Sequence, residues 1–126
     1  MKDEIFQLCD VIRDTSYALH MYLRHGHAEK VYENGLAHRL RKLNLEVHQQ
    51  HPIPVHDEDG TLLGDFYADL FINNQLIVEL KACRSVTDDH VAQLLGYLRG
   101  SRVEHGLLIN FGAPKLSIKK YVLSNS

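Results

Sequence analysis

Residues 67–81 of this chain read YADLFINNQLIVELK, and this stretch decides the fold of the surrounding sequence. Strand side chains point to alternate faces, and apolar residues alternate on both sides of the central Asn-Asn-Gln segment. The stretch therefore predicts an antiparallel β-hairpin with its loop at residues 73–75, where asparagine accepts the positive φ that such turns require. The register that brings the apolar faces together makes three pairs: Ile72 with Leu76, Leu70 with Val78, and Ala68 with Leu80.

Charged side chains fall on the other face of this hairpin. The register places Asp69 directly opposite Glu79, with Lys81 two residues further along on the same side. The Cβ atoms of such cross-strand neighbours lie roughly 4.5–5.5 Å apart, so two carboxylates would face each other. Because like charges so placed destabilise a sheet, we expect a compensating positive charge: Lys81 itself, a divalent cation, or both.

These three side chains indicate a metal-dependent hydrolytic site. Carboxylates held this close suit Mg²⁺ or Mn²⁺, which prefer oxygen ligands and keep waters for substrate phosphates. The ion would polarise a phosphoryl oxygen and help to form hydroxide, while Lys81 would orient the attacking water or stabilise developing charge. The alternative is an ion pair of Lys81 with Asp69 or Glu79 on the sheet surface, which contributes only ~0–1 kcal/mol when exposed. The shared face of the three groups and the apolar character of both strands favour the metal site.

Composition limits the class of protein. A chain of 126 residues with 44% hydrophobic and 24% charged residues predicts a single soluble domain over residues 1–126, whose core needs no disulfide or metal. The sequence has no signal-peptide pattern and no apolar run of membrane-spanning length, so we expect a cytoplasmic protein without a membrane partner. The net charge of -2 is not the basic excess of most nucleic-acid-binding domains, which weakens a nuclease interpretation without excluding it.

Hydrophobic periodicity and turn residues predict the remaining elements. The expected elements are helices over residues 3–24 and 27–43, an edge strand or irregular extended segment over 47–55, a tight turn at 57–60, the hairpin, a helix from the N-cap Thr87 to about Gly100, and strands over 106–111 and 117–123. This order predicts an α+β fold in which helices cover a mixed sheet that contains an antiparallel meander.

Several helical positions carry polar residues whose role the pattern leaves open. Glu29 shares the stripe of the second helix that carries Tyr32 and Leu36, and a carboxylate on a buried face must be paired, hydrogen-bonded or bound to metal. The alternative is that Glu29 lies in the first turn, where the helix dipole favours acids and water has access. Glu33 is equally ambiguous. On the third helix Gln93 lies in a polar stripe beside the core, which is typical of a solvated flank.

Residues of this chain also match, in order and spacing, the motifs of a known family. The matching residues are Gly26, Glu29 and Tyr32 of a GxxExxY signature, then Asp69, residues 79–81 (ELK) and residues 93–98 (QLLGYL). From about Ile12 to the final strand the chain resembles the GxxExxY family of the PD-(D/E)xK nuclease-like superfamily. This resemblance implies a restriction-endonuclease-like core. Ala68 stands where the superfamily name has proline, at a position that varies.

The resemblance also implies a role for each candidate residue. It implies that a divalent cation, Mg²⁺ or Mn²⁺, is bound by two carboxylates and a backbone carbonyl. The implied roles are metal binding for Asp69, Glu79 and the Leu80 carbonyl, catalysis for Lys81, a helix carboxylate at the outer side of the metal for Glu29, and support of the site for Gln93.

The function expected from these observations is Mg²⁺-dependent hydrolysis of phosphodiester bonds in DNA or, with less support, in RNA. The alternative from another class is a catalytically silent nuclease-like module that binds nucleic acid or a protein partner, which the net charge and short length favour. A third alternative is that Asp69, Glu79 and Lys81 are purely structural. A homodimer would provide the two sites that cutting both strands of a duplex requires.

Overall fold

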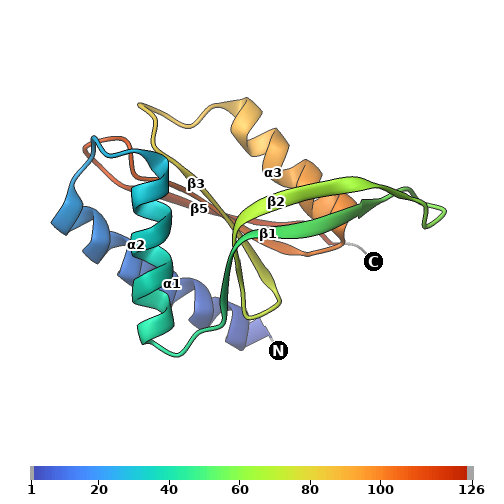
Figure 1. Cartoon of the computed structure of the whole chain (residues 1–126), viewed down its shortest axis with the longest axis horizontal. Coiled ribbons are helices and arrows are strands. Elements are labelled where there is room, and N and C mark those ends of the chain that lie inside the picture. The colour runs from blue at the N-terminus through green and yellow to red at the C-terminus, as the bar shows by residue number, and fades with distance from the viewer. Residues whose placement is uncertain (1, 125–126) are drawn as a thin grey trace.

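The computed structural model of the protein describes residues 2–124, with side chains from residue 4 onward (Figure 1). The helices and strands of this part of the chain are, in order, α1 (Lys2–Leu23), α2 (Glu29–Lys42), β1 (Val47–His56), β2 (Leu62–Ile72), β3 (Leu76–Lys81), α3 (Asp88–Ser101), β4 (His105–Asn110) and β5 (Ser117–Val122). All the predicted elements are present, although β2 begins earlier than the apolar alternation indicates.

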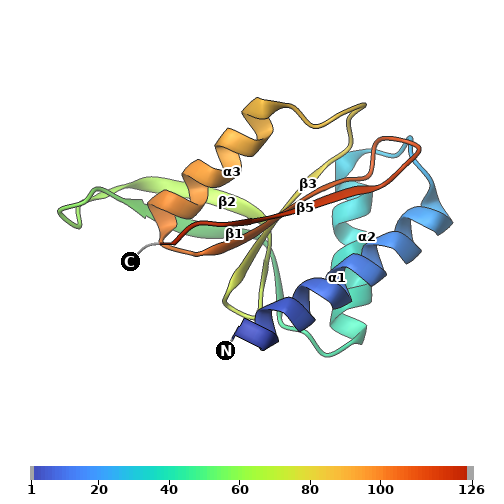
Figure 2. The ribbon, with the colours of Figure 1, turned by 180° about the vertical axis from the view of Figure 1, so that it is seen from behind.

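The strands form one mixed sheet in the order β1-β2-β3-β4-β5. Neighbouring strands are antiparallel except β3 and β4, which are parallel and are connected through α3. Figures 1 and 2 show α1 and α2 against one side of the sheet and α3 against the other. The predicted α+β fold with an antiparallel meander is therefore confirmed. None of the helices within residues 2–124 has the length and apolarity that crossing a membrane requires.

Alternate residues of the central strands pack into two separate hydrophobic cores, one on each face of the sheet. Val78 and Ile109 pack with the buried residues of α1 and α2, whereas Ile77 and Leu108 pack with those of α3. All four side chains are almost completely buried. Strands covered on both faces read as continuous apolar runs, which is why residues 106–111 gave a clear strand prediction.

The β1–β2 hairpin changes sides along its length. Ala68 and Leu70 are two residues apart and would share a face in a regular strand, yet Leu70 packs in the core of α1 and α2 and Ala68 in the core of α3. The change falls at Asp69, opposite the point where Gln50 of β1 takes a left-handed φ of 49°. Beyond it the two strands extend as an arm beside α3 (Figure 1). The sheet is therefore bent at the position of one of the predicted site residues.

The predicted hairpin register holds near the loop but not further along it. Leu70 pairs with Val78 and Ile72 with Leu76, and the loop residues Asn73 and Asn74 have the expected positive φ. The backbone ladder ends at Leu70 and Val78. The predicted direct pairs of Asp69 with Glu79 and of Ala68 with Leu80 are therefore corrected: these residues lie beyond the ladder, where the strands diverge.

Candidate functional site

The carboxylates of Asp69 and Glu79 lie between β2 and β3 at the point where the strands diverge. The backbone N–H of Asp69 donates to Glu79 Oε2 at 2.9 Å, and the backbone N–H of Leu80 donates to Asp69 Oδ2 at 2.8 Å. Each carboxylate thus accepts a backbone N–H of the facing strand. The two acids therefore bridge β2 and β3 just beyond the last residues of the ladder.

Glu79 is the more buried of the two acids, with 9% of its surface exposed. Burial, and after it the negative charge of Asp69, raises the pKa of Glu79 to about 8. The N–H of Asp69 and the ammonium of Lys81 act in the opposite direction but are outweighed. Near neutral pH this pair of acids therefore carries a proton, and a cation placed between them would displace it.

Lys81 is the last residue of β3 and is half-buried. Among the side chains of residues 4–124, the ion pairs within 4.0 Å involve other residues, so the ion pair of Lys81 with Asp69 or Glu79 is not observed. The charge of Lys81 nevertheless lowers the pKa values of both Glu79 and Glu29, so the ammonium acts on the site without being tied to one acid.

The two acids of α2 have different surroundings. Glu29 lies in the first turn and is exposed, whereas Glu33, one turn further on, is only 3% exposed. Partial burial of its carboxyl group, and then the charge of Asp69, raises the pKa of Glu29, while Lys81 lowers it. Glu29 therefore faces the site from α2, from the solvent-accessible first turn that was one of its two predicted positions.

Two residues of α3 lie on the other side of the acids. Gln93 is exposed, and its side chain acts to lower the pKa of Tyr97, one turn further along the helix. The ring of Tyr97 stacks on Phe66 with 3.8 Å between centroids. Burial, and then the charges of Glu79 and Asp69, raises the pKa of Tyr97. The polar stripe of α3 therefore faces the carboxylates, and Tyr97 belongs beside Gln93 among the residues that surround the site.

The backbone that follows Lys81 is fixed by the buried side chain of Asn110 at the end of β4. Asn110 Oδ1 accepts from the N–H groups of Cys83 and Gly112 at 3.1 and 3.0 Å, and its Nδ2 donates to the Cys83 carbonyl at 3.0 Å. Gly112 passes so close that an added Cβ would lie 2.2 Å from the Cys83 nitrogen. Sequence analysis missed this support, although an asparagine ending an apolar strand is a signal that could have indicated it.

Within residues 2–124, no three His, Cys, Asp or Glu side chains are arranged to hold a metal ion by themselves. The donors that meet are the two carboxylates of Asp69 and Glu79. Mg²⁺ is commonly bound through one or two carboxylates and completes its octahedron with waters and substrate phosphates. The chemistry of this donor set therefore fits such an ion.

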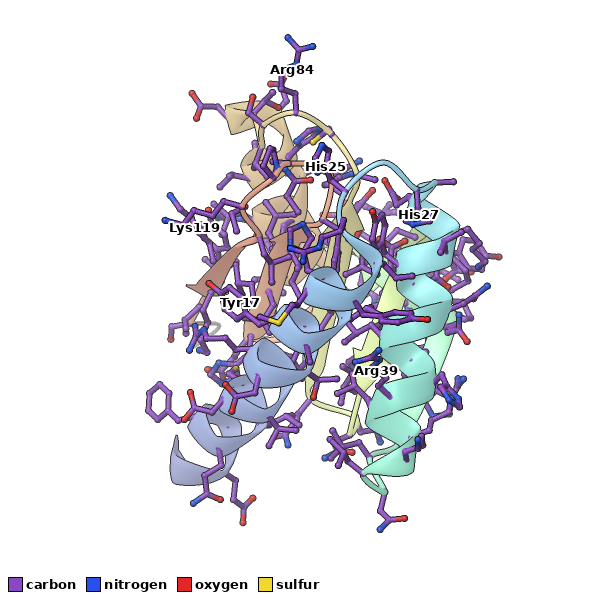
Figure 3. All side chains as sticks on the ribbon, turned by 90° about the vertical axis from the view of Figure 1, so that its left-hand side faces the viewer. Tyr17, His25, His27, Arg39, Arg84 and Lys119 are labelled. Carbon is purple, nitrogen blue, oxygen red and sulfur yellow. The ribbon has the colours of Figure 1, made fainter. Side chains whose placement is uncertain are left out.

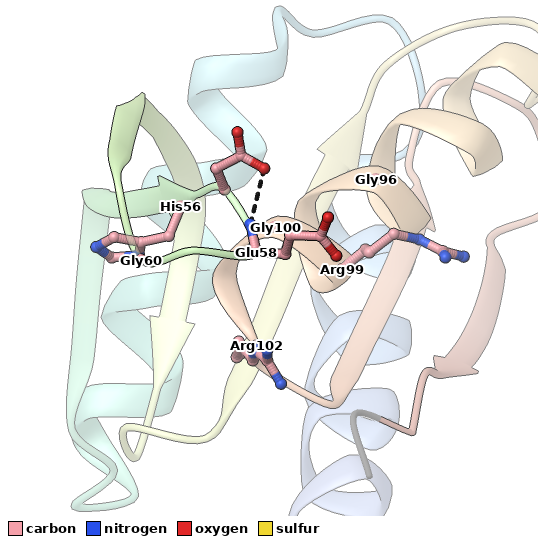
Figure 4. Close-up of a pocket in the computed structure, with 8 residues that line it drawn as sticks. His56, Glu58, Gly60, Gly96, Arg99, Gly100 and Arg102 are labelled. Atoms are coloured by element: carbon pink, nitrogen blue, oxygen red, sulfur yellow. Dashed lines mark hydrogen bonds between the residues drawn. The ribbon is translucent and has the colours of Figure 1, made fainter.

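A cavity of about 650 Å³ lies away from these residues, between the tip of the β1–β2 arm and the end of α3 (Figure 4). Its lining has mixed charge, with Arg99 and Arg102 on one side and Asp57 and Glu58 on the other. The cavity contains none of the predicted site residues.

A bent mixed sheet between helices, with acids on two diverging strands and a lysine two residues after the second acid, is the architecture of restriction-endonuclease-like nuclease folds. The chain belongs to the PD-(D/E)XK nuclease superfamily, since the model of that superfamily matches residues 6–121. No curated protein and no solved structure shows significant similarity to the chain.

Proposed function

We propose that the protein is a Mg²⁺- or Mn²⁺-dependent nuclease that hydrolyses phosphodiester bonds of DNA, with RNA as the less favoured substrate, and that residues 1–126 form its single domain. The observation that carries the proposal is the pair of carboxylates, Asp69 and Glu79, that meet between diverging strands, with the charge of Lys81 acting on Glu79. Membership of the superfamily and the order of the sequence motifs support it, and the same motifs support assignment to the GxxExxY family.

The chain supplies all the groups that such a reaction needs. Asp69 and Glu79 would hold the divalent ion together with the Leu80 carbonyl. When bound, the ion supplies the positive charge that polarises the phosphoryl oxygen and lowers the pKa of water. Lys81 would orient the attacking water or stabilise the charge on the scissile phosphate, and Glu29 would be the helix carboxylate beside the bound ion.

The helix α3 borders the site from the opposite side. Gln93 would support the reacting groups from α3, one turn before Tyr97, whose ring stacks on Phe66.

Exposed side chains that can donate to phosphates lie toward the end of the molecule where β3 ends, although the whole chain has a net charge of -2. Arg84 follows β3, and His25 and His27 belong to the loop before α2; they lie toward the same end of the molecule (Figure 3). Contacts to backbone phosphates from such residues position nucleic acid without reading its sequence.

A homodimer would bring a second site to the opposite strand of a duplex.

Cleavage of linear, nicked and supercoiled DNA with 5 mM Mg²⁺, 5 mM Mn²⁺ or EDTA tests the proposal, with those concentrations chosen as roughly saturating for weak sites. We expect metal-dependent cleavage that falls about 100-fold or more in Lys81→Ala and Asp69→Asn. Lys119→Ala, which changes an exposed lysine of β5, is the matched control and should cleave as the wild type does. Cleavage that persists unchanged in Lys81→Ala or Asp69→Asn would sink the assignment.

The second candidate function is a catalytically silent module that binds nucleic acid or a protein partner. The absence of a ready three-ligand arrangement within residues 2–124 favours it. Calorimetric titration of the folded protein with Mn²⁺ separates the two functions. Binding that is lost in Asp69→Asn supports the nuclease, whereas no binding at millimolar Mn²⁺ supports the silent module.

A further inference from the structure

The buried acid Glu33 takes no part in the proposed reaction, yet it is fully engaged. Its Oε2 accepts from Lys30 Nζ at 2.9 Å and from Gln49 Nε2 at 2.8 Å, and its Oε1 accepts from Gln50 Nε2 at 2.8 Å. A carboxylate that is only 3% exposed is costly to bury unless such donors satisfy its oxygens. Glu33 is therefore a fixed acceptor on α2.

The amide of Gln50 connects this acceptor to the candidate site. The same Nε2 that donates to Glu33 also donates to Asp69 Oδ1 at 3.1 Å. Since Asp69 Oδ2 is held by the N–H of Leu80, both oxygens of Asp69 have a fixed donor. A neutral amide thus stands between two carboxylates and gives each of them one hydrogen.

The backbone of β1 is distorted at the residue that makes this link. Consecutive strand residues point to opposite faces, yet Gln49 and Gln50 both reach the carboxylate of Glu33. The left-handed φ of 49° at Gln50 makes this arrangement possible, and a residue other than glycine adopts it only at a cost in free energy.

The distortion is not the result of an inserted residue. Gln49 pairs with Leu70 and His51 with Ala68, so the register of β1 and β2 is the same before and after Gln50. The strand pairing therefore does not require the strained backbone at Gln50. The strain occurs at the residue whose side chain joins Glu33 to Asp69, which suggests that it serves to orient one of these two acids.

We propose that Gln50 is a positioning residue: anchored on the buried Glu33, it fixes the orientation in which Asp69 receives the divalent cation. The role rests on the proposed metal site, because Gln50 acts on the ion through Asp69. Second partners of this kind orient metal-binding carboxylates, and their loss typically lowers metal affinity 10–100-fold.

Calorimetric titration of the full chain with MnCl₂ tests this role in the wild type, Gln50→Gly and Gln49→Ala. Glycine accepts the positive φ at position 50 without strain, so Gln50→Gly removes the amide while preserving the bend of the hairpin. We expect about a tenfold loss of Mn²⁺ affinity in Gln50→Gly, and a Tm no lower than that of Gln49→Ala, which also loses one donor to Glu33. Gln49→Ala removes the neighbouring donor to Glu33 but no contact with Asp69, and its Mn²⁺ affinity should stay within about threefold of the wild type.

A second variant guards against a failure of Gln50→Gly to fold. Asparagine also tolerates a left-handed backbone, and its side chain is one methylene too short to join Glu33 to Asp69, so Gln50→Asn should show the same loss of affinity. Wild-type affinity in a folded Gln50→Gly or Gln50→Asn overturns the positioning role and leaves the metal site standing. An equal loss in Gln49→Ala also overturns it, because the two glutamines would then act only by supporting the hairpin. A wild type that binds no Mn²⁺ refutes the metal site itself and the positioning role with it.

Discussion

Replacement of Glu79 by glutamine tests the electrostatics of the site without metal or substrate. The pKa of Glu79 is raised to about 8 by burial and by Asp69, from the 4.5 of an unperturbed glutamate. Between these two pH values the folded protein keeps a proton that the unfolded chain has lost. Because the folded state then binds more protons, the free energy of unfolding of the wild type falls as the pH rises from about 4.5 to about 8, and this contribution is constant above that window.

The size of the effect follows from the same two values. Each pH unit of such a difference corresponds to about 1.4 kcal/mol, so Glu79 destabilises the wild type by at most roughly 5 kcal/mol at pH 9. Glutamine has no charge to bury, and its amide oxygen can still accept the N–H of Asp69. We expect Glu79→Gln to raise the free energy of unfolding by roughly 2–5 kcal/mol at pH 9 and by less than about 1 kcal/mol at pH 4.

Urea unfolding at pH 4, 7 and 9 measures this difference. Circular dichroism is the suitable signal, because residues 2–124 include three helices and the chain has no tryptophan whose fluorescence could be followed. Glu58→Gln is the matched control, because Glu58 is exposed in the turn at the end of the arm. Its stability should differ from that of the wild type by the same small amount at each pH. Destabilisation by Glu79→Gln at pH 9, or an effect of equal size at all three pH values, would refute the reasoning.

Three further variants test how the surroundings of the site are held. Asn110→Leu removes the partner of the N–H and C=O of Cys83 and of the N–H of Gly112, and urea unfolding should show a loss of roughly 3 kcal/mol or more, at about 1–3 kcal/mol for each of these three groups. Gly112→Ala places a Cβ 2.2 Å from a backbone nitrogen, so it should lower Tm markedly and weaken Mn²⁺ binding by displacing the chain after β3; an unchanged Tm would contradict the close approach. Thr87→Ala removes the cap that accepts the N–H of His90 and should cost only about 1 kcal/mol in the same unfolding assay, so a loss equal to that of Asn110→Leu would contradict the ranking.

The hairpin shows which part of the site sequence can predict. Alternation and the Asn-Asn-Gln loop gave the pairing from Leu70 to Val78 correctly, because these depend on local periodicity. They did not predict that the ladder ends there. A carboxylate that takes the place of a backbone partner is an arrangement in three dimensions, and the pattern of apolar residues contains no signal for it.

Helical periodicity likewise could not distinguish two acids one turn apart. Glu29 and Glu33 lie near the same face, and the start of α2 at Glu29 decides that the first is exposed and the second buried. Gln50 was beyond prediction for a different reason. Glutamine is an ordinary residue in an edge strand. A positive φ is usually signalled by glycine or asparagine, and position 50 has neither.

The dual role of the acids determines how mutations at the site should be interpreted. Where β2 and β3 diverge, the carboxylates of Glu79 and Asp69 accept the N–H groups of Asp69 and Leu80. Alanine at position 69 would remove a metal donor and also the oxygen that accepts the N–H of Leu80, so loss of cleavage in that variant would have two explanations. Asparagine keeps one oxygen for Leu80 and removes the charge, although it also removes the second oxygen, which accepts from Gln50. If Asp69→Asn retains the wild-type Tm but loses both Mn²⁺ binding and cleavage, the carboxylate of Asp69 acts on the ion. If the Tm of the variant also falls, the carboxylate is needed to stabilise the folded sheet.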